Sequence, residues 1–200
     1  MTTLWIHVVK LMTLFVGMGA VASSSVSAIL PESLAISAPV PSSAVASSTK
    51  PLNREYGVRL RIPSIAVNAV VEPVGLYPDG SLGAPKGPST LGWFDKGPRP
   101  GEKGSAVIDG HFGWKDGIPA VFDHLSKLSP GDKIYFDRGD GTTVVFVVRA
   151  TKNYGEHEDA SAVFASNDGK AHLNLITCGG IWNKAAKSYS NRFVVFADRE

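Results

Sequence analysis

Cysteine is nearly absent from this chain of 200 residues, in which Cys178 is the only one. A lone cysteine excludes an internal disulfide, so Cys178 has either a free thiol or a partner in another molecule. Most free cysteines in proteins are buried and inert. The residues around Cys178 must therefore decide between a structural cysteine and a reactive one.

The chain also lacks an excess of either charge. It has 20 Lys and Arg residues against 18 Asp and Glu residues, which gives a formal net charge of +2. Domains that bind nucleic acid usually carry a basic face on a clearly basic domain. The charge balance therefore excludes nucleic acid as the expected partner.

Long apolar runs are missing except at the N-terminus. Residues 1–28 have a weak positive start at Lys10, an apolar run over 11–22, and small residues that end at Ala28 like a signal-peptidase site. Counted from Leu4, the run is long enough to span a membrane. We expect a cleaved signal peptide or an N-terminal membrane anchor, and an exported chain in both cases.

Residues 29–53 have almost no charge and are rich in Ser, Pro and Ala. This composition cannot build a hydrophobic core and is typical of a flexible, partly extended linker. Residues 54–200 are then the folded domain. Export normally favours disulfides, which makes the lone cysteine of this domain more unusual.

The folded domain has short apolar runs and many turn residues, with 21 Gly and 13 Pro in the whole chain. Alternating apolar residues predict seven or eight short strands, and the clearest hairpin lies at 132–151. Short helices are predicted over 118–131 and 158–166. We expect an all-β, mainly β fold, in which a closed barrel or a sandwich protects the strand edges.

Three chemically capable side chains stand at the ends of predicted strands. Cys178 ends "AHLNLITC" just before two glycines, His111 ends "SAVIDGH", and Arg192 begins "RFVVFA". Strand ends are where a rigid scaffold presents groups to a cleft. These three residues are therefore the candidate site.

The three side chains suit acyl transfer through a thioester. A nearby cation lowers the pKa of a thiol and activates it as a nucleophile. A histidine can return a proton to an amine leaving group, and an arginine can stabilise an oxyanion. Spacing alone leaves a catalytic and a structural interpretation of Cys178 open.

The local motifs resemble those of sortases, the cysteine transpeptidases of bacterial cell envelopes. The family pattern Thr-Leu-x-Thr-Cys is matched by "NLITC" at 174–178, with Asn174 departing at the first position. The resemblance also includes "RLRIPSI", "GPRPGEKGSAVIDGH", "FDHLSKLSPGDKI" and "NRFVVFA", in the family's order over 54–200. The motifs "GPRPGE" and "TCGG" are most similar to those of class F sortases, with class E as second choice, although Asp109 stands where a small residue is more usual.

The resemblance implies an eight-stranded sortase-type β-barrel in which Cys178 is the nucleophile, His111 the general acid and Arg192 the transition-state stabiliser. It implies cleavage of a Leu-Pro-x-Thr-Gly-like sorting signal between Thr and Gly. The acyl group would then pass to an amine on a peptidoglycan precursor or a pilin lysine, which attaches proteins to the cell wall. The expected location is extracytoplasmic, either anchored in the membrane of a bacterium or secreted to its wall.

Further residues near the trio are candidates for binding. Thr177 is expected to contact the substrate, and Trp182 to form a wall of the cleft. The acidic stretch with Glu156, Glu158 and Asp159 is interpreted either as a calcium site that modulates activity or as a solvated loop, the second being the expectation. No metal and no cofactor are expected.

Two other functions fit parts of the sequence. An L,D-transpeptidase-like enzyme is also exported and uses Cys and His, but it would have Arg directly after the cysteine, where this chain has Gly179. A non-catalytic exported β-domain that binds cell wall would use Cys178 structurally. The linker shows no evident lid motif, which favours housekeeping attachment over pilus assembly.

Overall fold

The computed structural model describes residues 58–185 and 188–200. They form eight strands: β1 (Arg59–Ile62), β2 (Val67–Val74), β3 (Leu91–Phe94), β4 (Gly104–Gly110), β5 (Lys133–Asp137), β6 (Thr143–Gly155), β7 (Ala171–Asn183) and β8 (Ser188–Arg199). Between them lie one short helix, α1 (Ser161–Phe164), and 3₁₀ turns at Pro63–Ile65, Lys115–Gly117 and Leu125–Lys127. The predictions for 1–28 and 29–53 lie outside the described residues.

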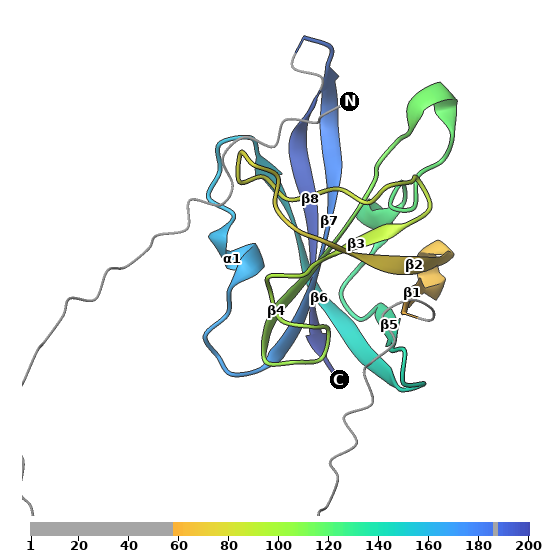
Figure 1. The fold of residues 1–200 in the computed structure, drawn as a ribbon, viewed down its shortest axis with the longest axis vertical. Helices are drawn as coiled ribbons and strands as arrows, with labels where there is room; N and C mark the ends of the chain where they lie inside the picture. Colours follow the sequence, from red (N-terminus) through yellow and green to blue (C-terminus); the bar gives the residue numbers. More distant parts are fainter. Residues whose placement is uncertain (1–57, 186–187) are drawn as a thin grey trace, which may run out of the picture. The chain divides into compact units, whose positions relative to one another are not determined.

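The strands close into one barrel in the order β1-β2-β3-β4-β7-β8-β6-β5, which confirms the predicted fold class. The pairs β2–β3 and β4–β7 are parallel, and the other neighbours are antiparallel. In Figure 1, β7 and β8 extend past the neighbouring strands as a hairpin. The parallel β4–β7 pair brings the C-terminal ends of both strands to the same end of the barrel.

Alternate residues of every strand fill the interior of the barrel, as expected when one face of a pleated strand is buried. On β7 these are Leu173 and Leu175, both completely buried. Phe122, Leu125 and Leu128, from the segment between β4 and β5, join the same core. This core fixes β7 against both of its neighbours.

A second apolar cluster covers part of the outer face of the same strands. Val107 of β4, Ile176 of β7 and Val194 of β8 pack there with Val163 of α1. Figure 1 shows α1 beside this part of the barrel. Because β7 is buried on both faces, its sequence has a nearly continuous apolar run rather than strict alternation.

The two helix predictions have different outcomes. The one over 158–166 is confirmed as α1, while the one over 118–131 is wrong, because that segment forms turns and a 3₁₀ turn. Its core residues Phe122, Leu125 and Leu128 are spaced by three, which matches the three residues per turn of a 3₁₀ helix. No helix within residues 58–185 or 188–200 is long and apolar enough to cross a bilayer.

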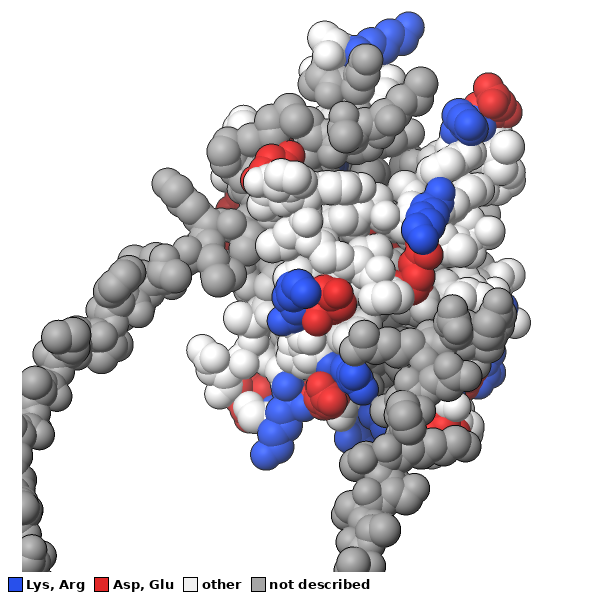
Figure 2. All heavy atoms as spheres, in the orientation of Figure 1, with Lys and Arg blue, Asp and Glu red and all other residues white. Residues whose placement is uncertain are grey.

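The charged side chains are interspersed by sign on the face drawn in Figure 2. Elsewhere on the barrel, β1 and β5 are joined by a bidentate contact in which Arg61 donates from Nε and Nη2 to the two carboxylate oxygens of Asp137, at 2.6 and 2.9 Å. That face therefore has no broad area of one charge, in keeping with the balanced composition.

Candidate active site

Cys178 and Arg192 lie directly opposite each other on the antiparallel strands β7 and β8. Directly opposite residues stand on the same face of a sheet, with their Cβ atoms about 4.5–5.5 Å apart. That face is the outer face of the barrel, which also holds Ile176. The thiol is free and partly exposed. Two residues that the sequence placed at separate strand ends are thus neighbours.

His111 reaches the same place from the other side of β7. Strand β4 pairs in parallel with β7 as far as Asp109 and Ile176, and two residues further along come His111 and Cys178. The strand order β4-β7-β8 therefore puts Cys178 between His111 and Arg192. The structure brings the three predicted catalytic residues together, and their roles remain a prediction.

The His111 ring has a fixed orientation. Its Nε2 lies 2.9 Å from the carbonyl oxygen of Pro85, and its ring meets that of Trp114 edge to face at 4.6 Å between centroids. A carbonyl oxygen only accepts, so Nε2 carries the hydrogen and donates it. The nitrogen that remains to exchange a proton is Nδ1.

Gly110, just before His111, has no room for a side chain. A Cβ atom there would lie 2.5 Å from Phe122 Cδ2 and 2.7 Å from Leu91 Cδ2. Carbon atoms that are not bonded to each other do not come so close. The glycine thus lets the core pack tightly under the histidine, which explains the Gly-His pair found in the sequence.

Thr177 faces the barrel interior rather than the outer face that carries Cys178. Its side chain is buried, and its Oγ1 donates a hydrogen bond of 2.7 Å to the Gly110 carbonyl oxygen. This bond joins β7 to β4 one residue before Cys178 and His111. It fixes the strands that carry the trio, while the expected contact of Thr177 with substrate stays a prediction.

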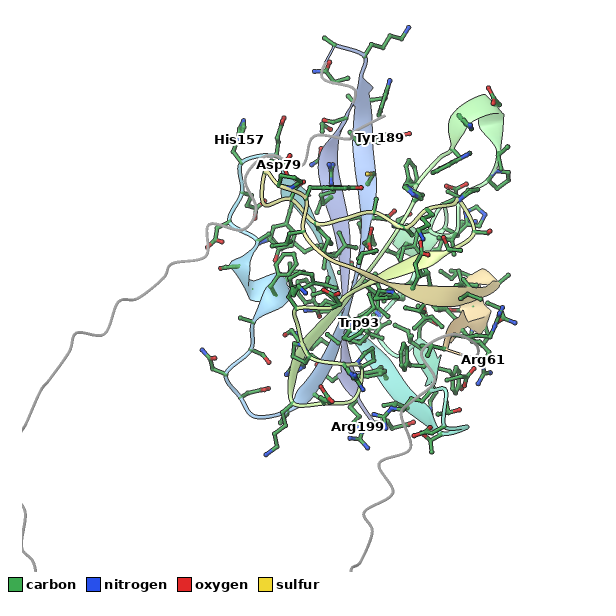
Figure 3. All side chains as sticks on the ribbon, viewed as in Figure 1. Arg61, Asp79, Trp93, His157, Tyr189 and Arg199 are labelled. Carbon is green, nitrogen blue, oxygen red and sulfur yellow. The ribbon has the colours of Figure 1, made fainter. Side chains whose placement is uncertain are left out.

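The glycines after Cys178 allow β7 to change course. Gly180 has φ of +79°, a left-handed conformation that side chains disfavour, and the pairing register shifts between Gly179 and Trp182. Trp182 then packs edge to face on Tyr189, with 5.0 Å between ring centroids. Figure 3 shows Tyr189 in this hairpin. Trp182 is thus beside the site, but not among the residues that line the cavity described next.

A cavity opens next to Arg192, between β7, β8 and the segment that contains α1. Its lining includes Tyr154, Val163, Phe164, Ile176, Arg192 and Val194. Most of these side chains are apolar, and Arg192, Glu156 and Glu158 are the charged residues of the lining. The cavity extends from Arg192 to the Ile176–Val194 pair, so it offers a largely apolar pocket beside Arg192, although Cys178 itself does not line it.

Burial controls the ionisation of the pair. Burial raises the pKa of the Cys178 thiol, the Arg192 guanidinium partly offsets this, and the Asp109 carboxyl adds to the rise. Burial lowers the pKa of Arg192, while Cys178 and Glu156 raise it. The thiol of the free protein therefore keeps its proton at neutral pH, and removal of that proton makes it a nucleophile.

The acidic side chains in the segment after β6 make local ion pairs and hydrogen bonds. Glu158 pairs with Lys152 at 2.8 Å, and Asp159 accepts a hydrogen bond from the Ser161 backbone N–H. Within the described part of the chain, no three His, Cys, Asp or Glu residues are grouped so as to hold a metal ion. His157, labelled in Figure 3, is exposed on the same loop.

Sequence reasoning missed the environment of Asp109. It noted the residue only as a departure from the family pattern, whereas the structure pairs it with Ile176 on the outer face, two residues before Cys178 on β7. It also missed that Asp168 and Asp198 bind His172 at the far end of β7. Asp168 and His172 are close in the sequence, and this spacing could have indicated their contact. Asp198 is far from His172 in the sequence, so no local pattern indicated the second contact.

The sortase domain family matches residues 60–200. The chain is similar to the solved structures of sortase C-1 from Actinomyces oris (22% identity, TM-score 0.55, 72% of this chain and 73% of that one) and a lid mutant of sortase A from Corynebacterium diphtheriae (24%, 0.56, 72% and 69%). It is also similar to a pilus-related sortase C of Group B Streptococcus (22%, 0.57, 74% and 68%). None of the curated proteins compared with the chain matches it.

Proposed function

Because the chain belongs to the sortase family of cysteine transpeptidases, we propose that it cleaves a Leu-Pro-x-Thr-Gly-like sorting signal between Thr and Gly and passes the acyl group to an amine. The observation that carries this proposal is the position of Cys178 between Arg192 on β8 and His111 after β4. These are the three groups that thioester-mediated acyl transfer needs.

The first half-reaction forms the thioester. The thiol proton passes to Nδ1 of His111, and the Cys178 thiolate attacks the threonine carbonyl carbon. The carbonyl oxygen becomes an oxyanion, for which Arg192 supplies N–H donors from the opposite strand. The C–N bond to glycine then breaks as His111 returns the proton to the leaving amine. The products are an acyl-thioester on Cys178 and a free glycine amine.

The second half-reaction reverses the proton flow. An acceptor amine attacks the thioester carbonyl, His111 takes a proton from it, and Arg192 again faces the oxyanion. The C–S bond breaks and leaves the Cys178 thiolate, which regains its proton from His111. Because Pro85 holds Nε2–H, both transfers use Nδ1.

The finer assignments rest on the sequence. The motifs "GPRPGE" and "TCGG" favour class F of the sortases, with class E second. We expect substrate proteins with an LPxTG-like C-terminal signal and an acceptor on a peptidoglycan precursor, in preference to a pilin lysine. Residues 1–28, as signal peptide or anchor, and the linker at 29–53 would place the domain outside the cell membrane.

The test uses the full chain with a Leu-Pro-x-Thr-Gly peptide library and hydroxylamine as a simple amine acceptor. Intact-protein mass spectrometry should detect a thioester on Cys178, and the peptide products should carry the hydroxamate. Both signals should be lost in Cys178→Ala, His111→Ala and Arg192→Ala. His124→Ala is the matched control, because His124 is exposed and lies outside the site.

A folded protein that forms neither product would contradict the proposal. If its thiol also reacted with iodoacetamide only after denaturation, Cys178 would be structural. The non-catalytic wall-binding domain would then be the better interpretation.

A further inference from the structure

Residues 112–121 form a loop that follows His111 and returns to it. The loop closes where the Phe122 N–H donates a hydrogen bond of 3.1 Å to the His111 carbonyl oxygen. Most of its residues are exposed, and its regular structure is the short 3₁₀ turn at Lys115–Gly117. A loop with few buried contacts opens easily, so it needs specific contacts to keep one conformation.

Asp123 supplies two such contacts. Its Oδ1 accepts a hydrogen bond of 2.7 Å from the Gly113 N–H near the start of the loop. Its Oδ2 accepts one of 2.9 Å from the Ala120 N–H near the end. A carboxylate holds backbone N–H groups more strongly than a neutral acceptor does. One side chain thus holds both ends of the loop.

The loop carries one of the two contacts that orient the His111 ring. Trp114 belongs to the loop, and its ring meets the imidazole edge to face at 4.6 Å between centroids. The other contact is the Pro85 carbonyl oxygen, 2.9 Å from Nε2. The segment with Pro85 is joined to the same loop, because the Val121 N–H donates to the Pro88 carbonyl oxygen at 2.8 Å. The orientation of the imidazole therefore depends on the position of the loop.

The start of the loop also packs against the hairpin that follows Cys178. The ring of Phe112 meets that of Tyr189 edge to face at 5.4 Å, and a Cβ atom on Gly113 would lie 3.0 Å from Tyr189 Oη. Burial raises the pKa of the Tyr189 hydroxyl, and charges on Cys178 and Asp123 raise it further. Asp123 is thus close to the site, and the loop that it holds fits tightly there.

Resting on the proposed function, we propose that Asp123 is a positioning residue that acts on His111 through Trp114. By holding the loop closed, it keeps the Trp114 ring against the imidazole and directs Nδ1 toward the leaving amine. Both carboxylate oxygens of Asp123 accept backbone N–H groups, so Asp123 transfers no proton itself. Its loss should affect the proton transfer and leave the binding of the sorting signal unchanged.

The leaving group of the substrate separates this role from a general effect on the fold. An amide bond breaks when its nitrogen receives a proton, which His111 returns from Nδ1. A peptide thioester instead releases a thiolate, which leaves without that proton. In both cases the Cys178 sulfur bonds to the same acyl group. A misplaced imidazole should therefore slow the amide reaction more than the thioester reaction.

The experiment uses the full chain and two peptides that share the Leu-Pro-x-Thr sequence. One continues with glycine through an amide bond, and the other with thioglycolate through a thioester bond. Acylation of Cys178 is followed in quenched samples by intact-protein mass spectrometry. Asp123→Ala should slow acylation by the saturating amide peptide about tenfold, since a displacement of about 1 Å can cost about 10². The peptide concentration at half-maximal rate should not change, and the thioester peptide should react at nearly the wild-type rate.

A second variant and a control accompany Asp123→Ala. Asp123→Asn should lose less, because its carboxamide oxygen replaces only one of the two acceptors. Asp132→Ala is the matched control, with no effect expected on either rate. Asp132 accepts the N–H of Ser129 at 2.8 Å, three residues earlier, as Asp123 does with Ala120, but it precedes β5, outside the site. Thermal unfolding confirms that each variant is folded.

A double-mutant cycle tests the route through Trp114. Trp114→Ala should slow the amide reaction by a factor similar to that of Asp123→Ala. If both act on the same ring, the double variant should lose little more than either single variant. Losses that multiply would overturn the route through Trp114.

The remaining outcomes are distinguishable. An unchanged amide rate in folded Asp123→Ala, an equal loss with both peptides, or an effect confined to the half-maximal concentration would overturn the positioning role. Each of these results would leave the proposed function standing. If the amide peptide formed no thioester on the wild-type chain, the proposed function would fail, and the inference about Asp123 would fail with it.

Discussion

Strand β7 carries ionisable side chains on its outer face at both ends, and their surroundings differ. Near its start, His172 is 6% exposed, and its two ring nitrogens lie 2.7 Å from Asp198 and 2.9 Å from Asp168. Near the point where the hairpin leaves the barrel, Cys178 and Arg192 have pKa values that burial shifts toward their uncharged forms. In Figure 3, Tyr189 marks the second end and Arg199 the first.

This difference means that one end of β7 contributes to stability and the other carries the candidate reactive groups. Ionised carboxylates only accept hydrogen bonds, so both His172 nitrogens donate and the arrangement favours the imidazolium form. At the other end, burial opposes the thiolate and raises the pKa of the Asp109 carboxyl. Perturbed groups gather at functional sites, because chemistry needs charges that a stable fold would avoid. Changes at the two ends should therefore have separable effects.

The largest effect is expected for Cys178→Ala at the reactive end. Removing the nucleophile should lower transpeptidation by roughly 10⁴-fold or more, as in other enzymes that form a covalent intermediate. The midpoint of thermal unfolding should change little, because the thiol is only partly buried. Product formation by mass spectrometry and a melting curve test both statements. Retained turnover would remove Cys178 from the mechanism.

A smaller loss is expected for Arg192→Lys, which keeps the charge and changes its geometry. Lysine lacks the planar fork of donors, so the oxyanion would lose a positioned hydrogen bond. We expect a fall of about 10²–10³ in kcat with little change in KM. Steady-state kinetics with one peptide measures this. A change confined to KM would instead give Arg192 a role in ground-state binding.

The effect of Arg192→Ala on the ionisation of the Cys178 thiol can be measured without any substrate. The guanidinium lowers the pKa of Cys178, so its removal should raise that pKa. The profile of iodoacetamide alkylation rate against pH should shift to higher pH, with slower alkylation at neutral pH. An unshifted profile would show that the two side chains do not interact in solution.

The smallest effect is expected at the stable end, for His172→Gln. Burial alone would lower the pKa of His172, but the hydrogen bonds to Asp168 and Asp198 outweigh it and the pKa is raised. A raised folded-state pKa adds stability that is fully present below about pH 6.5 and is lost as pH rises through the folded value. The variant should thus lose about 1 kcal/mol of unfolding free energy at pH 6 and less at pH 9.

Urea unfolding at the two pH values measures the loss, with His124→Gln as the matched exposed control. Activity of folded His172→Gln should match that of the wild type. An equal loss of stability at both pH values would mean that the imidazolium form contributes nothing. Impaired turnover in the folded variant would show that the two ends of β7 are coupled.

Part of this arrangement was predictable from the sequence. The alternation of apolar residues in "AHLNLITC" and "RFVVFA" predicted a strand that ends at Cys178 and another that begins at Arg192. This alternation is a local pattern, so it can be identified without the tertiary structure. Barrel closure followed only from the family resemblance, since strand order depends on pairings between distant residues. The buried position of Asp109 depends on Gly92, which belongs to a different strand and lies 17 positions earlier. No local pattern carries that information.

The order β4-β7-β8 also has a stereochemical consequence. Adjacent strands are about 4.8 Å apart, so His111 and Arg192 flank Cys178 from opposite sides. If Arg192 binds the oxyanion and His111 protonates the leaving amine as proposed, a carbonyl above the thiol turns its oxygen toward β8 and its leaving nitrogen toward β4. That orientation, together with the direction in which the peptide runs along β7, then determines which of the two faces of the carbonyl the sulfur attacks.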